Sequence, residues 1–287
     1  MQNIEIAVGK DDRLIGHLFP AEPACRKGRS VIVGPATAVP QTFYYNFCRY
    51  LAGHGFDVLT FDFHSVGQSK LRPIRDYADI GFSSWAEQDY PAVIDWMRAR
   101  HPSQPLYIVG HSVGGWMPAL TRASSRIDGL LGIAALSAYW PLMARPHRYF
   151  HWFAWRALVP LSTAVFGYWP GWAGLNHDLP TKLGREFAEW AQQADFVFDA
   201  RQFDPRGNAL AFKGHLHLYQ ISDDPWGTPE AVRSLIAHYP NARSAAMETL
   251  RPADFGGKAI GHLNFFRSIH KDTLWPHALK QLEAFGG

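Results

Sequence analysis

The pentapeptide Gly110-His111-Ser112-Val113-Gly114 has the pattern Gly-x-Ser-x-Gly and follows directly on the strand-like run LYIVG. A helical pattern begins immediately after it. A serine on so sharp a strand-to-helix turn has a strained backbone and an exposed hydroxyl beside a helix N-terminus, whose N–H groups can stabilise an oxyanion. Side chains at the flanking glycine positions would collide with the neighbouring strand and helix. The pentapeptide alone is common. Its place between a strand-like run and a helical pattern, however, predicts that Ser112 is a nucleophile.

A serine nucleophile needs a base and a carboxylate that orients the base. With this elbow the chain order is serine, acid, histidine. The run LHLYQIS ends in Asp223-Asp224, and a carboxylate there would lie at the same sheet edge as Ser112. Either aspartate fits the role of the acid, and the alternative is that both cap a turn or the next helix.

His262 is the histidine we expect to act as the base. It follows the last predicted strand and precedes the C-terminal helix. The other downstream histidines, His238, His270 and His277, end a helix or lie in or near the final one. None of them is placed to face the elbow as His262 is.

An oxyanion site needs two N–H donors. Val113, the residue after the nucleophile, is expected to supply one of them. The other should come from the loop after the strand-like run SVIVG. Pro35 has no N–H, so we favour Ala36, with Thr37 as the alternative.

The elements that position these residues alternate between strand-like and helix-like patterns. Strands are expected over 4–8, 13–19, 30–34, 57–63, 106–110, 129–138, 216–222 and 244–250, with a turn at 9–12. Helices are expected over 43–55, 83–102, 111–123, 228–240 and 272–285. This alternation predicts an α/β fold with a mostly parallel sheet covered on both faces.

The alternation breaks between residues 138 and 214. Strand signals vanish there, and this stretch holds six of the eleven tryptophans: Trp140, Trp152, Trp155, Trp169, Trp172 and Trp190. We therefore predict an α/β core over 1–137 and 215–287 with an aromatic-rich helical lid inserted over 138–214.

At these motifs the sequence resembles the α/β-hydrolase superfamily. The segment 62–69, DFHSVGQS, is similar to the family's strand-end D-x-R-G-x-G-x-S, and 110–115 resembles its nucleophile elbow. The segment 224–231, DPWGTPEA, resembles the acid segment, and Gly261-His262 matches the catalytic histidine. The resemblance implies an α/β-hydrolase fold, with Asp224 as the acid and Asp223 as the fallback. Many members have His-Gly-x at 34–36, where this chain has Gly-Pro-Ala.

Among subgroups, the elbow and the lid segment 166–171, FGYWPG, look most like bacterial predicted serine hydrolases related to the monoglyceride lipase and serine aminopeptidase group. Dehalogenases and epoxide hydrolases of the superfamily have an aspartate nucleophile where this chain has Ser112. The resemblance therefore disfavours those activities.

A lid rich in aromatic residues would enclose an apolar pocket over Ser112, with Trp116 and Trp140 as candidate lining residues. Core packing is the competing role for each tryptophan. His215 and His217 share a face of one strand, but no third ligand lies nearby in the sequence. We therefore expect ordinary packing or a place at the lid hinge, and no metal. No cofactor is expected.

Composition excludes several classes of protein. The net charge of +3, without a Lys/Arg run, is too mild for nucleic-acid binding. Cys25 and Cys48 lack metal-site spacing and are expected to be free thiols. The N-terminus does not read as a secretory signal, and charges and prolines interrupt the apolar stretch 150–175, so we expect a cytoplasmic protein without a membrane span.

The sequence thus predicts a serine hydrolase of esters or thioesters with an apolar acyl or aromatic group. The same residues would also serve amides, carbon–carbon hydrolysis or acyl transfer. The alternative is a non-catalytic scaffold that binds a small apolar ligand or a protein partner. A third option, contact of the aromatic lid with a membrane surface, ranks below both.

Overall fold

The computed structural model describes residues 1–9, 12–173, 177–201 and 203–286. Part of the predicted turn at 9–12 lies outside this range. Eight strands of the described chain form one sheet in the order β1-β2-β4-β3-β5-β6-β9-β10. Their bounds are β1 Gln2–Val8, β2 Asp12–Phe19, β3 Arg29–Gly34, β4 Phe56–Phe61, β5 Leu106–His111, β6 Gly129–Ile133, β9 His215–Ile221 and β10 Ser244–Leu250.

The sheet is parallel from β4 to β10, and only β1 and β2 run antiparallel to their neighbours. Strands β4, β5 and β6 are buried along their whole length, as their apolar runs require in a sheet covered on both faces. Gly34 at the end of β3 pairs with Gly110 near the end of β5. This register places the loop after β3 beside the turn that carries Ser112.

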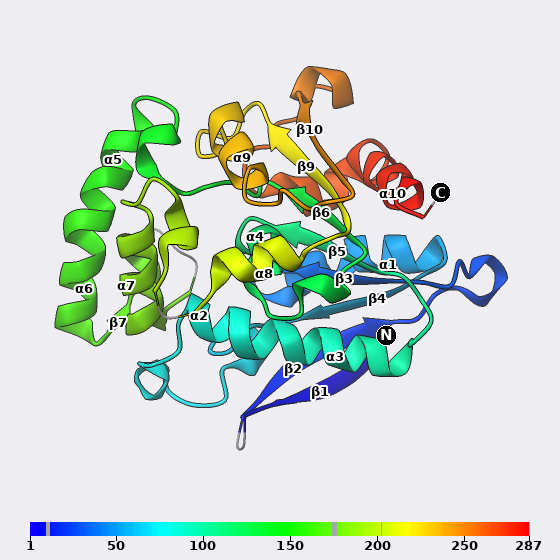
Figure 1. The fold of residues 1–287 in the computed structure, drawn as a ribbon, viewed down its shortest axis with the longest axis horizontal. Coiled ribbons are helices and arrows are strands. Elements are labelled where there is room, and N and C mark those ends of the chain that lie inside the picture. Colours follow the sequence, from blue (N-terminus) through cyan, green and yellow to red (C-terminus); the bar gives the residue numbers. More distant parts are fainter. Residues whose placement is uncertain (10–11, 174–176, 202, 287) are drawn as a thin grey trace.

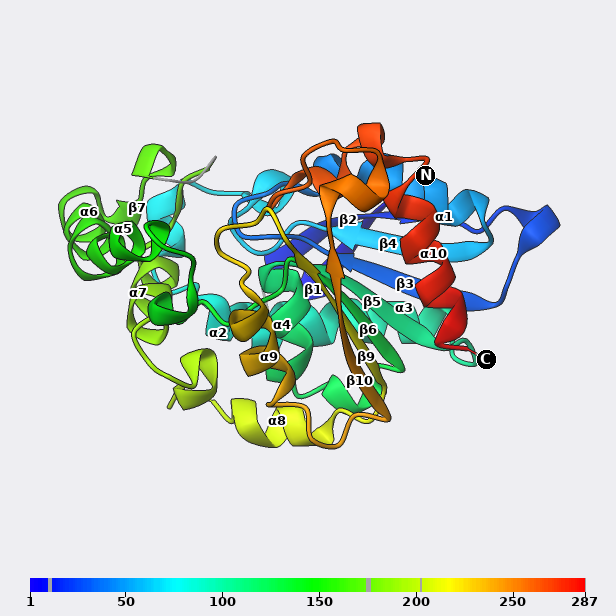
Figure 2. The ribbon, with the colours of Figure 1, turned by 90° about the horizontal axis from the view of Figure 1, so that it is seen from above.

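Helices cover both faces of the sheet, as predicted (Figure 2). Helices α1 (Tyr45–Gly53) and α10 (Leu274–Ala284) pack on one face. Helices α3 (Tyr90–Arg100), α4 (Val113–Leu120) and α9 (Pro229–Ile236) pack on the other. Two separate apolar clusters, one on each side of the sheet, make up the core.

The segment between β6 and β9 forms most of a helical layer beside the carboxyl edge of the sheet (Figure 1). It contains α5 (His147–Phe153), a π-helical turn (Ala154–Leu158), α6 (Val159–Phe166), α7 (Thr181–Trp190) and α8 (Pro205–Ala211). Helix α8 packs against α4 of the core. The prediction that strands are absent here is wrong, because β7 (Tyr168–Trp169) and β8 (Leu179–Pro180) form a short antiparallel pair. Two residues per strand are too few to leave an alternating pattern.

Two smaller expectations concern the two thiols and the apolar stretch 150–175. Cys25 and Cys48 are both free, the first exposed and the second buried. No helix in the described ranges has the length and apolarity needed to cross a bilayer.

Candidate active site

Ser112 lies on a strained turn between β5 and α4. Its φ of 51° and ψ of −113° are unusual for a residue with a side chain. Its N–H donates to the carbonyl of Ile133 at 2.9 Å, and its carbonyl accepts from Gly115 at 2.8 Å. These bonds hold the turn, so Ser112 is fixed at the N-terminus of α4 as predicted.

The glycines around Ser112 are required by close backbone approach. A Cβ at Gly110 would collide with the backbone of Gly114 and Gly115, and one at Gly114 would collide with the carbonyl of Gly34. The predicted reason for glycine on both sides of the serine is therefore confirmed. The backbones of α4 and β3 approach each other closely here, because α4 starts directly over the end of β3.

His262 and Asp224 form a hydrogen-bonded pair. The Nδ1 of His262 lies 2.7 Å from Oδ2 of Asp224, whose side chain is fully buried. The other oxygen, Oδ1, accepts the N–H of Trp226 at 3.0 Å. Because a carboxylate only accepts, Nδ1 carries the proton in a neutral His262, and Nε2 keeps its lone pair.

Asp223, the fallback acid, has different partners. Its two carboxylate oxygens accept the N–H groups of Ile260 and Gly261, each at 3.0 Å. These are the residues just before His262. Asp223 therefore anchors the loop that carries His262, whereas Asp224 contacts the imidazole itself.

A buried chain of hydrogen bonds, which we call the Tyr44–His111 relay, joins the loops around Ser112. The Nε2 of His111 lies 2.7 Å from the backbone carbonyl of His262, which can only accept, so Nε2 carries the proton. The Nδ1 of His111 then accepts from the Tyr44 hydroxyl at 2.7 Å. The same hydroxyl accepts the N–H of Ala36 at 2.9 Å.

Burial dominates the electrostatics of this relay. It lowers the pKa of His111 to about 3, and the nearby charge of His262 acts in the same direction. Burial also raises the pKa of the Tyr44 hydroxyl. Both groups are therefore neutral at pH 7. Sequence reasoning missed the relay because nothing in the pattern FYYNF shows which tyrosine faces the elbow.

The loop after β3 bears on the predicted oxyanion donors. The Ala36 N–H is engaged by Tyr44, which weighs against the preferred second donor. Ala36 and the alternative, Thr37, both line the same cavity as Ser112. The two residues differ in the state of their N–H groups, because the Thr37 N–H has no hydrogen-bond partner within the described residues. Val113 begins α4, where the first N–H groups have no partner inside the helix.

A cavity of about 350 Å³ lies between the sheet edge and the inserted segment that joins β6 to β9. Ser112, His262 and Thr37 line it on the core side. The wall formed by the inserted segment is aromatic or apolar, and it includes Phe150, His151, Trp155, Trp169 and Phe187. Among the described lining residues there is no Asp, Glu, Lys or Arg.

The tryptophans near this cavity differ from those predicted. Trp116 lines it, as expected, but Trp140 does not; Trp140 is half-buried and packs against the core. Trp226 also lines the cavity, and its ring centroid lies 4.7 Å from that of His262. Trp155 and Trp169 complete the aromatic part of the wall. Composition alone could not tell which tryptophans point inward.

Burial lowers the pKa of His151 to about 4, with a smaller contribution from the charge of His147. The His151 imidazole in the cavity wall is therefore neutral at pH 7. Together with the absence of charged side chains from the described wall, this makes the cavity suited to an uncharged, apolar group.

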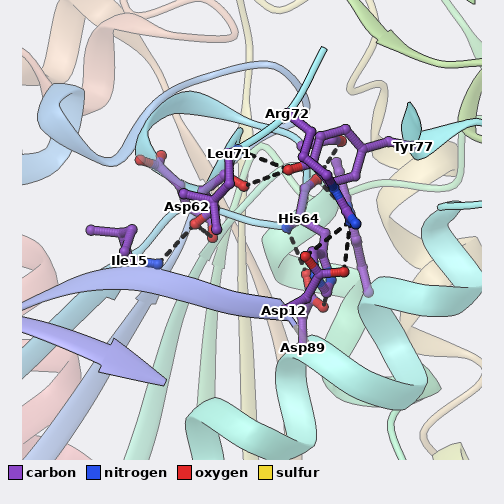
Figure 3. A network of polar contacts seen from close by, with 11 residues as sticks. Asp12, Ile15, Asp62, His64, Leu71, Arg72, Tyr77 and Asp89 are labelled. Carbon is purple, nitrogen blue, oxygen red and sulfur yellow. Dashed lines mark hydrogen bonds and ion pairs between the residues drawn. The ribbon is translucent and has the colours of Figure 1, made fainter. Parts of the chain in front are cut away.

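The loop after β4 is held by Asp62 (Figure 3). The Asp62 carboxylate accepts the N–H groups of Gln41 at 2.7 Å and Gln68 at 2.8 Å. It makes no contact with the His262 pair and serves the loop backbone.

His64 stands where the family's segment has arginine, and it bonds Asp89 through Nδ1 at 2.9 Å (Figure 3). Its Nε2 lies 3.7 Å from Asp12. Burial lowers the pKa of His64, but the hydrogen bond to Asp89 and the charges of Asp89 and Asp12 outweigh burial, so the pKa is raised. His64 therefore pairs with a buried carboxylate at the position where the family's segment has arginine.

His215 and His217 have other partners, as ordinary packing predicts. His215 bonds the Ser244 hydroxyl at 2.9 Å and stacks on Phe285. His217 lies 3.3 Å from Glu248. Within the described ranges, no group of three or more potential ligands is placed to hold a metal ion.

The sheet order, the strained serine turn and the inserted helices define an α/β-hydrolase fold. The family model described as serine aminopeptidase, S33, matches residues 38–195, more than half of the chain. The chain therefore belongs to the serine aminopeptidase S33 family of the α/β-hydrolase superfamily, and the predicted resemblance is confirmed. No curated protein matches the chain.

Solved structures with the same fold are distant in sequence. A soluble variant of monoglyceride lipase from Saccharomyces cerevisiae is 14% identical, with a TM-score of 0.67 over 98% of this chain and 94% of that one. A carboxyl esterase from Bacillus coagulans is 13% identical, with a TM-score of 0.66 over 99% and 98%. Est1E from Butyrivibrio proteoclasticus, bound to ferulic acid, is 14% identical, with a TM-score of 0.59 over 98% and 99%. At these identities the likeness establishes the fold alone.

Proposed function

We propose that the protein is a serine hydrolase that cleaves esters or thioesters of apolar acyl or aromatic acids. The observation that carries this proposal is the pairing of His262 with buried Asp224 at 2.7 Å, beside a cavity that both His262 and Ser112 line. A binding scaffold has no use for a carboxylate that fixes the tautomer of an imidazole next to a strained serine.

In the proposed mechanism the Ser112 hydroxyl attacks the acyl carbon while His262 Nε2 takes its proton. Asp224 holds the imidazole tautomer and stabilises the imidazolium. The N–H of Val113 and an N–H of the loop after β3 stabilise the oxyanion of the tetrahedral intermediate. His262 then protonates the leaving alcohol or thiol, and water releases the acid from the acyl-enzyme.

Between the two candidates in the loop after β3, the hydrogen bonds favour Thr37 as the second oxyanion donor. Ala36 would have to break its 2.9 Å bond to Tyr44 in order to donate to the substrate. Thr37 would break none within the described chain. Ala36 therefore serves better as the anchor of the loop.

The cavity supports the proposed substrate class. Its described wall is aromatic and aliphatic, and its only imidazoles are His262 and the neutral His151. Desolvating a charged acyl group there would cost several kcal/mol without a compensating partner. An apolar chain or an aromatic ring would instead replace water against Trp155 and Trp169.

The test is hydrolysis of p-nitrophenyl esters of rising acyl length by the wild type, Ser112→Ala and His262→Ala. We expect turnover by the wild type with an optimum length that the cavity sets, and background rates for both variants. Trp140→Phe, outside the cavity wall, is the control and should keep the same optimum. Absence of cleavage at every length by folded wild type would contradict the proposal.

A further inference from the structure

The outer surface of the lid is apolar where a soluble protein normally has polar residues. Helix α5, the π-helical turn and α6 form one helical run, and its inner side is buried through His151, Trp155 and Val159. A surface helix of this kind should be polar on the opposite side. The lid segment 147–172 instead holds eight of the thirteen large apolar side chains that are exposed in the described chain.

These side chains are well exposed and cover the length of the run. We define the lid face as Tyr149, Phe150, Trp152, Phe153, Leu161, Val165, Phe166 and Trp172. Leu161 and Val165 on α6 are each 66% exposed, and Trp172 just beyond it is 70% exposed. So dense a group of exposed apolar residues marks an interaction site.

The charged side chains within the lid segment itself are all basic. From residue 129 to 177 the sequence contains no Asp or Glu, whereas Arg145, Arg148 and Arg156 all lie in or next to the helical run. Arg148 lies over the Tyr149 ring and Arg156 over the Trp152 ring, at 5.0 and 5.6 Å. None of the three arginines forms an ion pair within the part of the chain that the structure describes.

Exposed aromatics with unpaired arginines beside them match the chemistry of a bilayer surface. Trp, Tyr, Phe and Leu enter the boundary between headgroups and acyl chains, and arginine binds lipid phosphate. A protein partner of complementary shape would also cover apolar side chains, but it would not need cations without carboxylates. The three arginines without ion pairs in the described chain favour anionic lipid.

The lid face continues into the cavity. Phe150 is exposed and also lines the cavity wall. Trp226, two residues after Asp224, is likewise exposed and lines the cavity. An apolar molecule at the lid face therefore meets an apolar entrance beside His262.

We propose that the lid face binds the surface of a bilayer that contains anionic lipid, with the cavity entrance turned toward it. Binding rests on the lid face and its arginines and not on catalysis. It is therefore separable from the proposed hydrolase activity.

The test is flotation of the full chain with vesicles of phosphatidylcholine, alone or mixed with phosphatidylglycerol. We expect the wild type and Ser112→Ala to float equally, and more strongly with the mixed vesicles. Leu161→Ser/Val165→Ser should lower the partition coefficient about tenfold. Arg148→Ala/Arg156→Ala should lower it about tenfold on mixed vesicles and little on phosphatidylcholine alone. The matched control, Leu210→Ser/Ile269→Ser, removes two exposed apolar side chains elsewhere and should float as the wild type.

Thermal unfolding of each variant checks that its fold is intact. Three results would overturn the proposal: wild type that remains with the unbound fraction on both vesicles, serine variants that float undiminished, or arginine variants that lose binding to both vesicles alike. A fourth result would also overturn it: the wild type is a dimer by sedimentation velocity, Leu161→Ser/Val165→Ser is a monomer, and the wild type does not bind either kind of vesicle. That result would assign the lid face to a second copy of the chain.

Discussion

Replacing Tyr44 with phenylalanine tests the relay that ties together the loops around Ser112. The Tyr44 hydroxyl accepts from Ala36 N–H and donates to His111 Nδ1, and all three groups are buried. Phenylalanine fills the same space but leaves two buried polar groups without partners. Each such group costs about 1–3 kcal/mol, so the free energy of unfolding should fall by about 2–5 kcal/mol. That is a large part of the total stability of a domain.

The assay is urea unfolding at neutral pH, with Tyr50→Phe as the matched control. Tyr50 lies on α1, the helix that begins directly after Tyr44. Its hydroxyl makes no hydrogen bond within the described residues, so its loss should change the free energy by less than about 0.5 kcal/mol. A double-mutant cycle with His111→Leu should show non-additivity of about 1 kcal/mol or more, because Nδ1 is then already absent. Equal stability of Tyr44→Phe and Tyr50→Phe would refute the relay.

Three further predictions concern the same region. The pKa of His111 in the folded chain is about 3, below the ordinary 6.5. Between these two pH values His111 is protonated in the unfolded chain and neutral in the folded chain. The free energy of unfolding therefore falls as the pH drops below about 6.5, by about 2 kcal/mol at pH 5. In urea unfolding, His111→Leu should lose about 2 kcal/mol less than the wild type over the same pH range. Asp224→Asn should lower kcat for ester hydrolysis about 10³- to 10⁴-fold with little change in KM. Asp223→Asn, which only loosens the His262 loop, should lower kcat much less. Equal decreases in kcat for the two variants would contradict the assignment. Gly114→Ala drives a methyl group into the backbone carbonyl of Gly34 and should destabilise the fold by about 1–3 kcal/mol in thermal or urea unfolding, and wild-type stability would refute the close contact.

The fold and the positions of Ser112 and His262 could be predicted because local patterns specify them. Buried parallel strands are continuous apolar runs, and the glycines at 110 and 114 are required by backbone contacts that hold in any side-chain packing. The site of Asp224 could be narrowed to two neighbours, since both follow β9. Which one faces His262 depends on the turn after the strand and not on residue type.

The cavity wall and the oxyanion loop could not be predicted in the same way. Trp140 and Trp155 are the same residue type in the same apolar segment, and only the three-dimensional path of the lid decides that Trp155 lines the cavity. The engagement of Ala36 by Tyr44 likewise depends on a tertiary contact between the β3 loop and the segment before α1. The exposure of the lid face could not be predicted either, because the tertiary structure decides which side of the helix faces outward. When apolar residues lie all round a helix, its sequence does not show which side is exposed.

The central claim is that Ser112 is an activated nucleophile, and covalent labelling tests it most directly. The folded chain is treated with a fluorophosphonate probe, and the modified residue is located by peptide mass spectrometry. We predict one labelled site, Ser112, with labelling abolished in Ser112→Ala and strongly slowed in His262→Ala. An unlabelled wild type, or a label on another serine that His262→Ala leaves unchanged, would contradict the account.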